Sequence, residues 1–431
     1  MSLSVIILSG SLAQAHGIWG HIHVTGWAME YTDHPELQEL FSDPEMRNTA
    51  LFGAAFTDSG YFPFNESTSQ YSRVYSEYTH WEPFVDDYIQ WMKLNDPPPF
   101  TSPESKKRVA FLLGTASHGL QDEIFDSLFL HRAQEEDGEG QGSLDPACDG
   151  FLAQDGELRF FPSKDIPFDP LLDIYGQLDP NISAEVIQDS VELMVGLYVN
   201  EDSGQNTAQS LADLYGENLI WTADNYLNPD IPGSIQSEII PTAKYMEAIW
   251  KRLHEEFLPQ DFIIATYPER GRVLNTIDHT SAGSWITAIF GAGMDIYQIE
   301  TSFRSESGTP ISTVHTGTEW GESWTRLIRI QPQESLKENH TYVVHIENVQ
   351  SSSGYTQEKD GFLIHTKCTP PSSMECLSIG VPDVASRTGI QEEETNANPS
   401  GCSHFSNGRL WGGLLLMFGV VTAFSRKEQQ R

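Results

Sequence analysis

The sequence predicts a multidomain protein in which a mostly helical N-terminal region is followed by a β-rich region and a short C-terminal hydrophobic segment. Three observations support this prediction. The 431 residues are too many for one ordinary domain. Apolar residues recur at three- and four-residue steps up to about residue 260, which is typical of helices. From Phe262 onwards they form short β-rich runs separated by Gly, Pro and Ser clusters, which indicates a β-sandwich.

The predicted boundaries follow these changes in pattern: a signal peptide (1–15), a helical domain (16–260), a β-sandwich (261–368), a flexible Pro/Ser/Glu/Asn-rich spacer (369–400) and a C-terminal sorting or anchoring segment (401–431). The last segment contains the apolar run Leu410–Phe424. This run is shorter than the ~20 residues that a stable membrane span needs.

The first residues have the features of an export signal. Val5–Leu8 forms an apolar core and Ala13-Gln-Ala15 has the small-x-small cleavage pattern, although a basic segment before the core is missing. Cleavage after Ala15 would make His16 the new N-terminus, so that its amino group and imidazole lie together. We therefore expect an exported protein at the cell surface or outer membrane.

The composition limits the partners. Acidic residues outnumber basic ones by 61 to 25, and the net charge is −36. Such a chain is electrostatically a poor partner for nucleic acid or for anionic lipid surfaces. We expect no nucleic-acid partner and a monomeric chain.

The spacing of apolar residues and the positions of turn-forming residues predict the remaining helices and strands. The expected helices are Trp27–Phe41, one with Pro83 in its first turn, one beginning at Val109, and 184–197, 207–215 and 240–257. The expected strands are 262–267, 285–290, 297–303, 327–330, 342–346 and 361–366. Residues 134–150 are expected to form an acidic, glycine-rich loop.

One predicted helix carries a row of polar residues. His118, Asp122 and Asp126 follow one another at four-residue steps after the apolar run Val109–Leu113. On an α-helix these positions lie on nearly one face. Two interpretations are open: a satisfied core histidine beside solvated carboxylates, or half of a metal site whose other ligands come from elsewhere.

Other segments supply candidate ligands of the same chemical kind. They are histidines near the expected N-terminus, an Asp in a turn, a His before a helix, and two Asp in the acidic loop: His16, His21, Asp58, His80, Asp145 and Asp149. Taken singly, each has an ordinary explanation as a turn or solvated residue. Together they favour a metal centre, because catalytic zinc takes His and carboxylate ligands and clustered metals suit phosphate-ester hydrolysis.

Four motifs, in order along the chain, resemble the zinc-dependent phospholipase C family, in particular the catalytic domain of glycosylphosphatidylinositol-specific phospholipases D. They are Gly17-Ile-Trp-Gly-His21 and its continuation to Glu30, Phe56-Thr-Asp58-Ser-Gly-Tyr-Phe-Pro63, Thr79-His80-Trp-Glu-Pro-Phe84, and Phe111-Leu-Leu-Gly-Thr-Ala-Ser-His118 with Asp122. The resemblance covers roughly residues 16–260. It implies an all-α domain that holds a zinc cluster and hydrolyses a phospholipid phosphodiester.

The resemblance also implies roles for single residues. His21, Asp58, His80, His118 and Asp122 correspond to metal ligands, with Asp122 bridging two metals. Asp58 corresponds in addition to the candidate general base. His16 corresponds to the terminal amine ligand, although its spacing to His21 is shorter than in the family.

Two departures concern one metal position. This chain has Asp126 where the family has a His, and Asp145 and Asp149 where it has a His and an acid. An all-carboxylate position favours a harder cation such as Mg²⁺, Mn²⁺ or Ca²⁺. We therefore expect two or three metals, mainly Zn²⁺.

The C-terminal part carries two further resemblances. Residues 261–368 resemble a bacterial immunoglobulin-like module, which implies an all-β sandwich. Gly401-Cys402-Ser403, the apolar run and the final Arg residues resemble a myxobacterial-type sorting signal.

The predicted function is therefore a secreted metal-dependent phosphodiesterase of the phospholipase C/D type, which acts on phospholipid at a membrane surface through metal-bound hydroxide. Two alternatives remain open: a non-catalytic, metal-stabilised surface protein with a degenerate site, and a related metal-dependent nuclease.

Overall fold

The computed structural model describes residues 16–367 apart from 63–67, 139–140, 157, 200–203, 205–208, 211, 215–217, 271–272 and 318–323. The predicted signal peptide, the spacer 369–400 and the terminal segment 401–431 lie outside the described residues. Within the described ranges, no helix is both long and apolar enough to cross a lipid bilayer.

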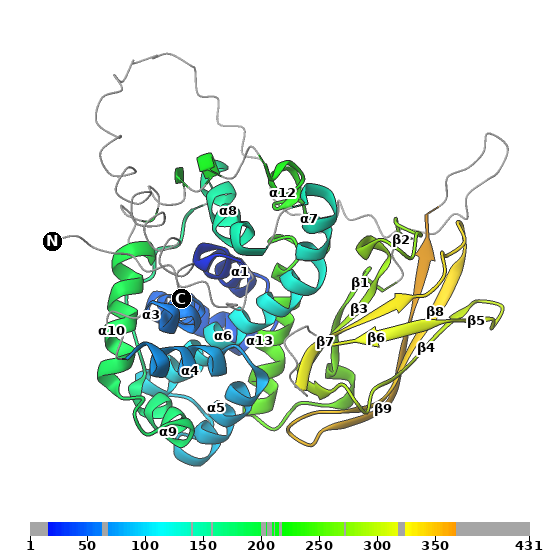
Figure 1. Ribbon diagram of the computed structural model, residues 1–431. Helices are drawn as coiled ribbons and strands as arrows, with labels where there is room; N and C mark the ends of the chain where they lie inside the picture. Colours follow the sequence, from blue (N-terminus) through cyan, green and yellow to red (C-terminus); the bar gives the residue numbers. More distant parts are fainter. Residues whose placement is uncertain are drawn as a thin grey trace, which may run out of the picture. The chain divides into compact units, whose positions relative to one another are not determined.

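Helices form the first part of the described chain (Figure 1). They are α1 (Ile18–Glu30), α2 (Pro35–Ser42), α3 (Pro44–Phe56), η1 (Thr57–Tyr61), α4 (Ser69–Thr79), α5 (Glu82–Asn95), α6 (Pro103–Ile124), η2 (Phe125–Phe129), α7 (Leu130–Asp137), α8 (Gln141–Gln154), α9 (Phe168–Leu178), α10 (Ala184–Met194), η3 (Val195–Val199), α12 (Ile220–Asn225), α13 (Ile239–Leu253) and η4 (Pro259–Asp261).

Local sequence signals explain where the longer helices begin. Ser102 precedes α6, and its hydroxyl accepts a hydrogen bond from the backbone N–H of Ser105 at 3.0 Å. Asp43 caps α3 in the same way through the N–H of Glu45. Each cap is followed directly by a proline, whose fixed φ suits the first helical turn and whose missing N–H has no partner to lose there.

The strands form two sheets in the described residues. One sheet has the order β1 (Ile263–Tyr267), β3 (Ile286–Asp295), β7 (Trp324–Pro332) and β6 (Thr313–Thr316). The other has the order β2 (Val273–Leu274), β9 (Thr356–Thr366), β8 (Thr341–Gln350), β4 (Glu300–Ser305) and β5 (Pro310–Ile311). All pairs are antiparallel except β2 with β9, and a short helix, η5 (Ala282–Ser284), precedes β3.

The predicted fold class, an all-α domain followed by an immunoglobulin-like sandwich, is wrong. The structure is a mixed α and β arrangement, and its described residues belong to one compact unit. Nine of the ten residues of β3 are buried, so both faces of this strand are covered, whereas burial in β8 alternates. Helix α13 packs against β1 and β3, and Ile289 and Leu327 belong to the apolar core of the helices.

The change in apolar period near Phe262 therefore marks a change of secondary structure rather than the end of a packing unit. The first sheet buries one face against helices, and the second sheet shares a further apolar cluster with it. A sequence period reports which residues along a strand are apolar, but it does not identify the element that covers them.

Three local predictions also need correction. His21 and His23 lie inside α1 rather than before the first helix. The predicted helix Trp27–Phe41 is interrupted, because α1 ends at Glu30 and α2 begins at Pro35. The predicted acidic loop 134–150 is largely helical, since α7 ends at Asp137 and α8 begins at Gln141.

Helices α3 and α6 cross at very short range because glycines lie at the crossing. A Cβ on Gly114 would lie 2.0 Å from the carbonyl oxygen of Ala50, and a Cβ on Gly53 would lie 2.6 Å from that of Phe111. Both distances are too short for any side chain, so the two backbones are in direct contact. This crossing places the end of α3 beside the second half of α6.

We expect Gly114→Ala to lower the free energy of unfolding by about 1–3 kcal/mol, because the added methyl group meets helix backbone that must move. Gly176→Ala in α9 is the matched control, since a Cβ there meets nothing within 4 Å. That variant should gain about 0.4–1 kcal/mol from the reduced flexibility of the unfolded chain. Urea unfolding of the two variants and the parent chain measures both values. Equal effects at the two sites would contradict the close crossing.

Candidate metal centre

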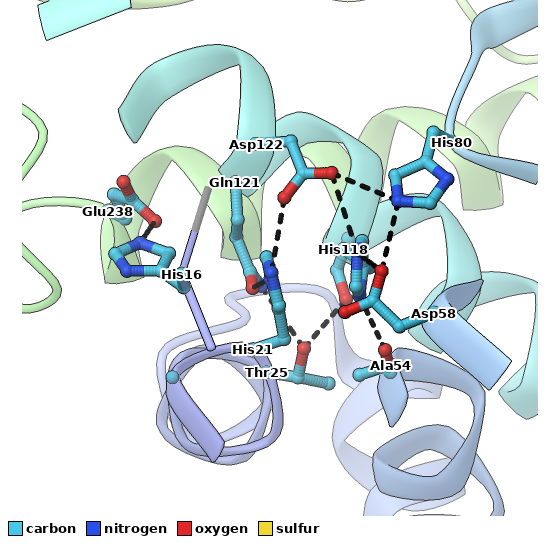
Figure 2. A network of polar contacts seen from close by, with 12 residues as sticks. His16, His21, Thr25, Ala54, Asp58, His80, His118, Gln121, Asp122 and Glu238 are labelled. Atoms are coloured by element: carbon cyan, nitrogen blue, oxygen red, sulfur yellow. Dashed lines mark hydrogen bonds and ion pairs between the residues drawn. The ribbon is translucent and has the colours of Figure 1, made fainter. Parts of the chain in front are cut away.

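Four segments bring together three imidazoles and two carboxylates, which we call the histidine–aspartate cluster: His21, Asp58, His80, His118 and Asp122 (Figure 2). His21 comes from α1, Asp58 from η1, and His118 and Asp122 from α6. His80 is the C-cap residue directly after α4.

Asp122 is the centre of the cluster. Its Oδ1 lies 3.1 Å from His21 Nε2, and its Oδ2 lies 3.3 Å from His80 Nε2 and 3.4 Å from His118 Nε2. Its side chain is only 5% exposed. One buried carboxylate thus contacts all three imidazoles, each from a different helical element.

Asp58 closes the cluster on the side nearer to solvent. Its Oδ1 lies 3.3 Å from His80 Nε2 and 3.6 Å from His118 Nε2. Its side chain is 18% exposed, more than any other member of the cluster. A solvent molecule or ligand therefore reaches the cluster most readily beside Asp58.

The outward nitrogen of each imidazole is bound to a fixed acceptor. His118 Nδ1 donates to the carbonyl oxygen of Ala54 at 2.6 Å, and His80 Nδ1 donates to that of Ser76 at 2.7 Å. His21 Nδ1 lies 2.9 Å from Oε1 of Gln121. These bonds orient the rings and leave the Nε2 lone pairs for the cluster, which is the arrangement usual around metal-bound histidines.

Burial and mutual charge set the protonation of the cluster. Burial alone would raise the pKa of Asp122, but His118 and His21 hold it well below its usual value. Burial would lower the pKa of His80, but Asp58 and Asp122 raise it to about 9. Burial, together with the neighbouring His21, lowers the pKa of His118. The carboxylates are therefore ionised, and the buried imidazoles differ in how readily they take a proton.

The residues fit a divalent cation. Two sets place ligand atoms within 4.8 Å of one another: His21, His118 and Asp122, and Asp58, His80 and His118. His118 Nε2 is fully buried and makes no hydrogen bond within the described part of the chain. An imidazole lone pair facing carboxylate oxygens needs either a proton or a metal between them.

His16 lies next to the cluster but contacts a different carboxylate. Its ring centroid is 5.4 Å from that of His21, and its Nε2 lies 2.8 Å from Glu238 Oε2 (Figure 2). Its Nδ1 lies 2.9 Å from the hydroxyl of Tyr226. Glu238 is completely buried, and burial together with the charges of Asp122 and Asp126 raises its pKa well above the usual value.

Two further predicted ligands, Asp126 and Asp149, are not members of the two ligand sets. Asp126 is buried in η2, one turn beyond Asp122. Its charge contributes to the raised pKa of Glu238. Asp149 caps α1, since its carboxylate accepts from the N–H of Gly20 at 2.9 Å and of Trp19 at 3.4 Å. Burial raises its pKa to about 7. The side chain of Asp145 lies outside the described residues.

The sequence interpretation missed two residues of this region. Gln121, which orients His21, directly precedes Asp122, and a search for carboxylates and imidazoles passes over an amide. Glu238 is the last residue of a run of turns, directly before α13, and this run carries no periodic signal. Its contact with His16, which directly precedes Gly17 and α1, is visible only in the folded structure.

Comparison with known proteins gives a distant sequence relative and several weak structural likenesses. No family model matches the chain. Over 118 residues the chain is 31% identical to the phosphatidylinositol-glycan-specific phospholipase D of Bos taurus. The match covers 27% of this chain and 14% of the length of that protein. The chain is thus distantly similar to a phospholipase, and this similarity does not address zinc or a β module.

The structural likenesses carry no argument about fold or function at their TM-scores. The copper resistance protein PcoC from Escherichia coli is 14% identical, with 25% of this chain and 97% of that one covered and a TM-score of 0.21. CopC from Methylosinus trichosporium OB3b is 15% identical, with 26% and 96% covered and a TM-score of 0.21. The S-layer protein SbsC is 10% identical, with 77% and 47% covered and a TM-score of 0.20.

Proposed function

We propose that the chain is an exported, metal-dependent phosphodiesterase that hydrolyses phospholipids at a membrane surface, with cleavage of the phospholipase C or D type. The convergence of three backbone- or amide-oriented imidazoles on Asp122 and Asp58 is the observation that carries the proposal. The distant similarity to a phospholipase supports the substrate class. The motifs in residues 17–122 support the same assignment.

The ligand types favour zinc. Asp58, His80 and His118 form one candidate ligand set, and His21, His118 and Asp122 form a second, so His118 is shared between them. Imidazole and carboxylate together are the usual ligands of catalytic zinc. His16 and Glu238 lie beside this second position. The carboxylate of Asp126 would suit a harder cation such as Mg²⁺, Mn²⁺ or Ca²⁺.

Bound divalent cations would supply an activated water and offset the charge that develops on the phosphoryl oxygens. The protein's own part is to fix the ligands and to handle the proton. Burial would raise the pKa of Asp58, but His118 and His80 lower it below the usual value, so this carboxylate is ionised at neutral pH. It is also the most exposed member of the cluster. Asp58 is therefore the proposed general base.

We expect elemental analysis of the purified full-length chain to find at least one divalent ion, and two when both ligand sets are occupied. His118→Ala and Asp122→Ala should each weaken metal binding by more than the ~10–100-fold that loss of an outer partner costs. Phosphodiesterase activity should fall with the metal content, because both residues contact the same ions.

His279→Ala is the matched control for this experiment. His279 is 39% exposed, and its Nδ1 lies 3.0 Å from the hydroxyl of Ser335 and 3.8 Å from Oδ1 of Asp278, neither of which belongs to the cluster. Its loss should leave metal content and activity unchanged. Intact metal binding and activity in His118→Ala would refute the proposed centre.

We expect Asp58→Asn to lower kcat by about 10²–10⁴-fold, because a neutral amide cannot accept the proton from the attacking water. KM should change little, and metal content should stay near that of the parent chain in the presence of excess metal. Steady-state kinetics with parallel elemental analysis separates the two roles. Activity that returns fully with added metal would show that Asp58 acts only as a ligand.

We expect faster hydrolysis of zwitterionic phosphatidylcholine vesicles than of vesicles rich in anionic lipid, because the chain carries a net charge of −36. The difference should narrow near 1 M salt, where the screening length is about 3 Å. Mass spectrometry of the products distinguishes diacylglycerol from phosphatidic acid. Cleavage of plasmid DNA without lipid turnover would instead establish a nuclease, and metal binding without any hydrolysis would establish a non-catalytic binding protein.

A further inference from the structure

A fully buried arginine reaches from the first sheet into the helices behind the histidine–aspartate cluster. Arg326 lies in β7 and is 0% exposed. Its Nε donates to Glu123 Oε1 at 2.7 Å, and its backbone N–H donates to Glu123 Oε2 at 2.9 Å. Glu123 follows Asp122 directly in α6, so the bridge is anchored at the residue next to the central carboxylate.

The same guanidinium binds the backbone of a second member of the cluster. Arg326 Nη2 donates to the carbonyl oxygen of His80 at 2.7 Å. His80 is the C-cap residue of α4, where backbone carbonyls have no partner in the next helical turn. Arg326 therefore satisfies that carbonyl and ties the backbone position of His80 to Glu123 of α6.

A glycine makes this three-way contact sterically accessible. A Cβ on Gly119 would lie 2.0 Å from the carbonyl oxygen of His80 and 2.9 Å from both terminal nitrogens of Arg326. Gly119 follows His118 on α6, so any side chain there would push the arginine and the His80 backbone away from that helix. The contact requires a residue without a side chain at this position.

We propose that Arg326 is a positioning residue of the metal centre, which fixes the backbone of His80 and the end of α6 so that His80 and Asp122 both face that centre. The inference rests on the proposed metal centre. It assigns the strand region a direct part in building that centre, since the arginine comes from β7 and both of its partners come from the helices.

A second buried arginine shows what a purely structural role in the same region looks like. Arg252 of α13 is 1% exposed and pairs with Glu82 Oε1 at 2.8 Å and Asp86 Oδ1 at 2.5 Å. It also lies 3.4 Å from the carbonyl oxygen of Gly291 in β3. Its hydrogen bonds join helix to strand as those of Arg326 do, but none of them goes to a member of the cluster.

The test compares Arg326→Met with Arg252→Met in the full-length chain. Each variant removes one buried guanidinium from the junction of helices and strands, so both should lower the melting temperature. Zinc affinity, measured by competition with a chelating dye, should fall ~10-fold or more in Arg326→Met, as it does when an outer partner of a metal ligand is lost. Arg252→Met should bind zinc with an affinity within about threefold of that of the parent chain, because none of its partners belongs to the cluster.

The lysine variants extend the test and replace it if the methionine variants do not fold. Lysine keeps the positive charge but lacks the planar fork that bonds Glu123 and the His80 carbonyl together. Arg326→Lys should therefore still bind zinc more weakly than the parent chain, while Arg252→Lys should not. Equal affinities in the Arg326 and Arg252 variants of either pair would overturn the inference.

The readout is independent of turnover. A parent chain that binds zinc but cleaves no phosphodiester would refute the proposed function and leave the comparison of arginines valid. A parent chain that binds no divalent ion would refute both.

Discussion

The histidine–aspartate cluster depends on the burial of Asp122 among imidazoles. A carboxylate removed from water must be neutralised by partners, and Asp122 has three imidazole nitrogens within 3.1–3.4 Å. Those nitrogens are themselves fixed because the opposite ring nitrogens are held by Ala54, Ser76 and Gln121. The outer hydrogen bonds thus fix the orientation of the three rings, which reduces the entropic cost of ordering the ligands when an ion binds.

The helix crossing beneath the cluster explains why these ligands meet. Gly53 and Gly114 let α3 and α6 touch through their backbones. The end of α3 then presents the Ala54 carbonyl to His118, and the following turn presents Asp58 to the same ring. A packing constraint between two helices thereby becomes a constraint on donor and acceptor positions in the site.

The sequence predicts the parts of the site that depend on local geometry. The four-residue step from His118 to Asp122 places both on one face of α6, as expected, because helical geometry alone determines it. The sequence alone could not place Asp149, whose carboxylate caps α1. Capping of a helix by a residue 130 positions away is a tertiary contact. Nor could the sequence show that Glu238 meets His16 over a separation of 222 residues.

The fold class was wrong for the same reason, and Arg326 shows why the difference matters. A strand of the pattern Trp-Thr-Arg-Leu-Ile-Arg-Ile predicts an arginine at the surface of an ordinary sandwich, because unpaired charge is excluded from cores. Here the strand is covered by helices, and the arginine is buried because Glu123 and the His80 carbonyl neutralise and bind it. Charge that looks solvent-facing in the sequence is instead a contact between strands and helices. Loosening of the first sheet would therefore displace the backbone of His80 and the end of α6, to which Arg326 is hydrogen-bonded.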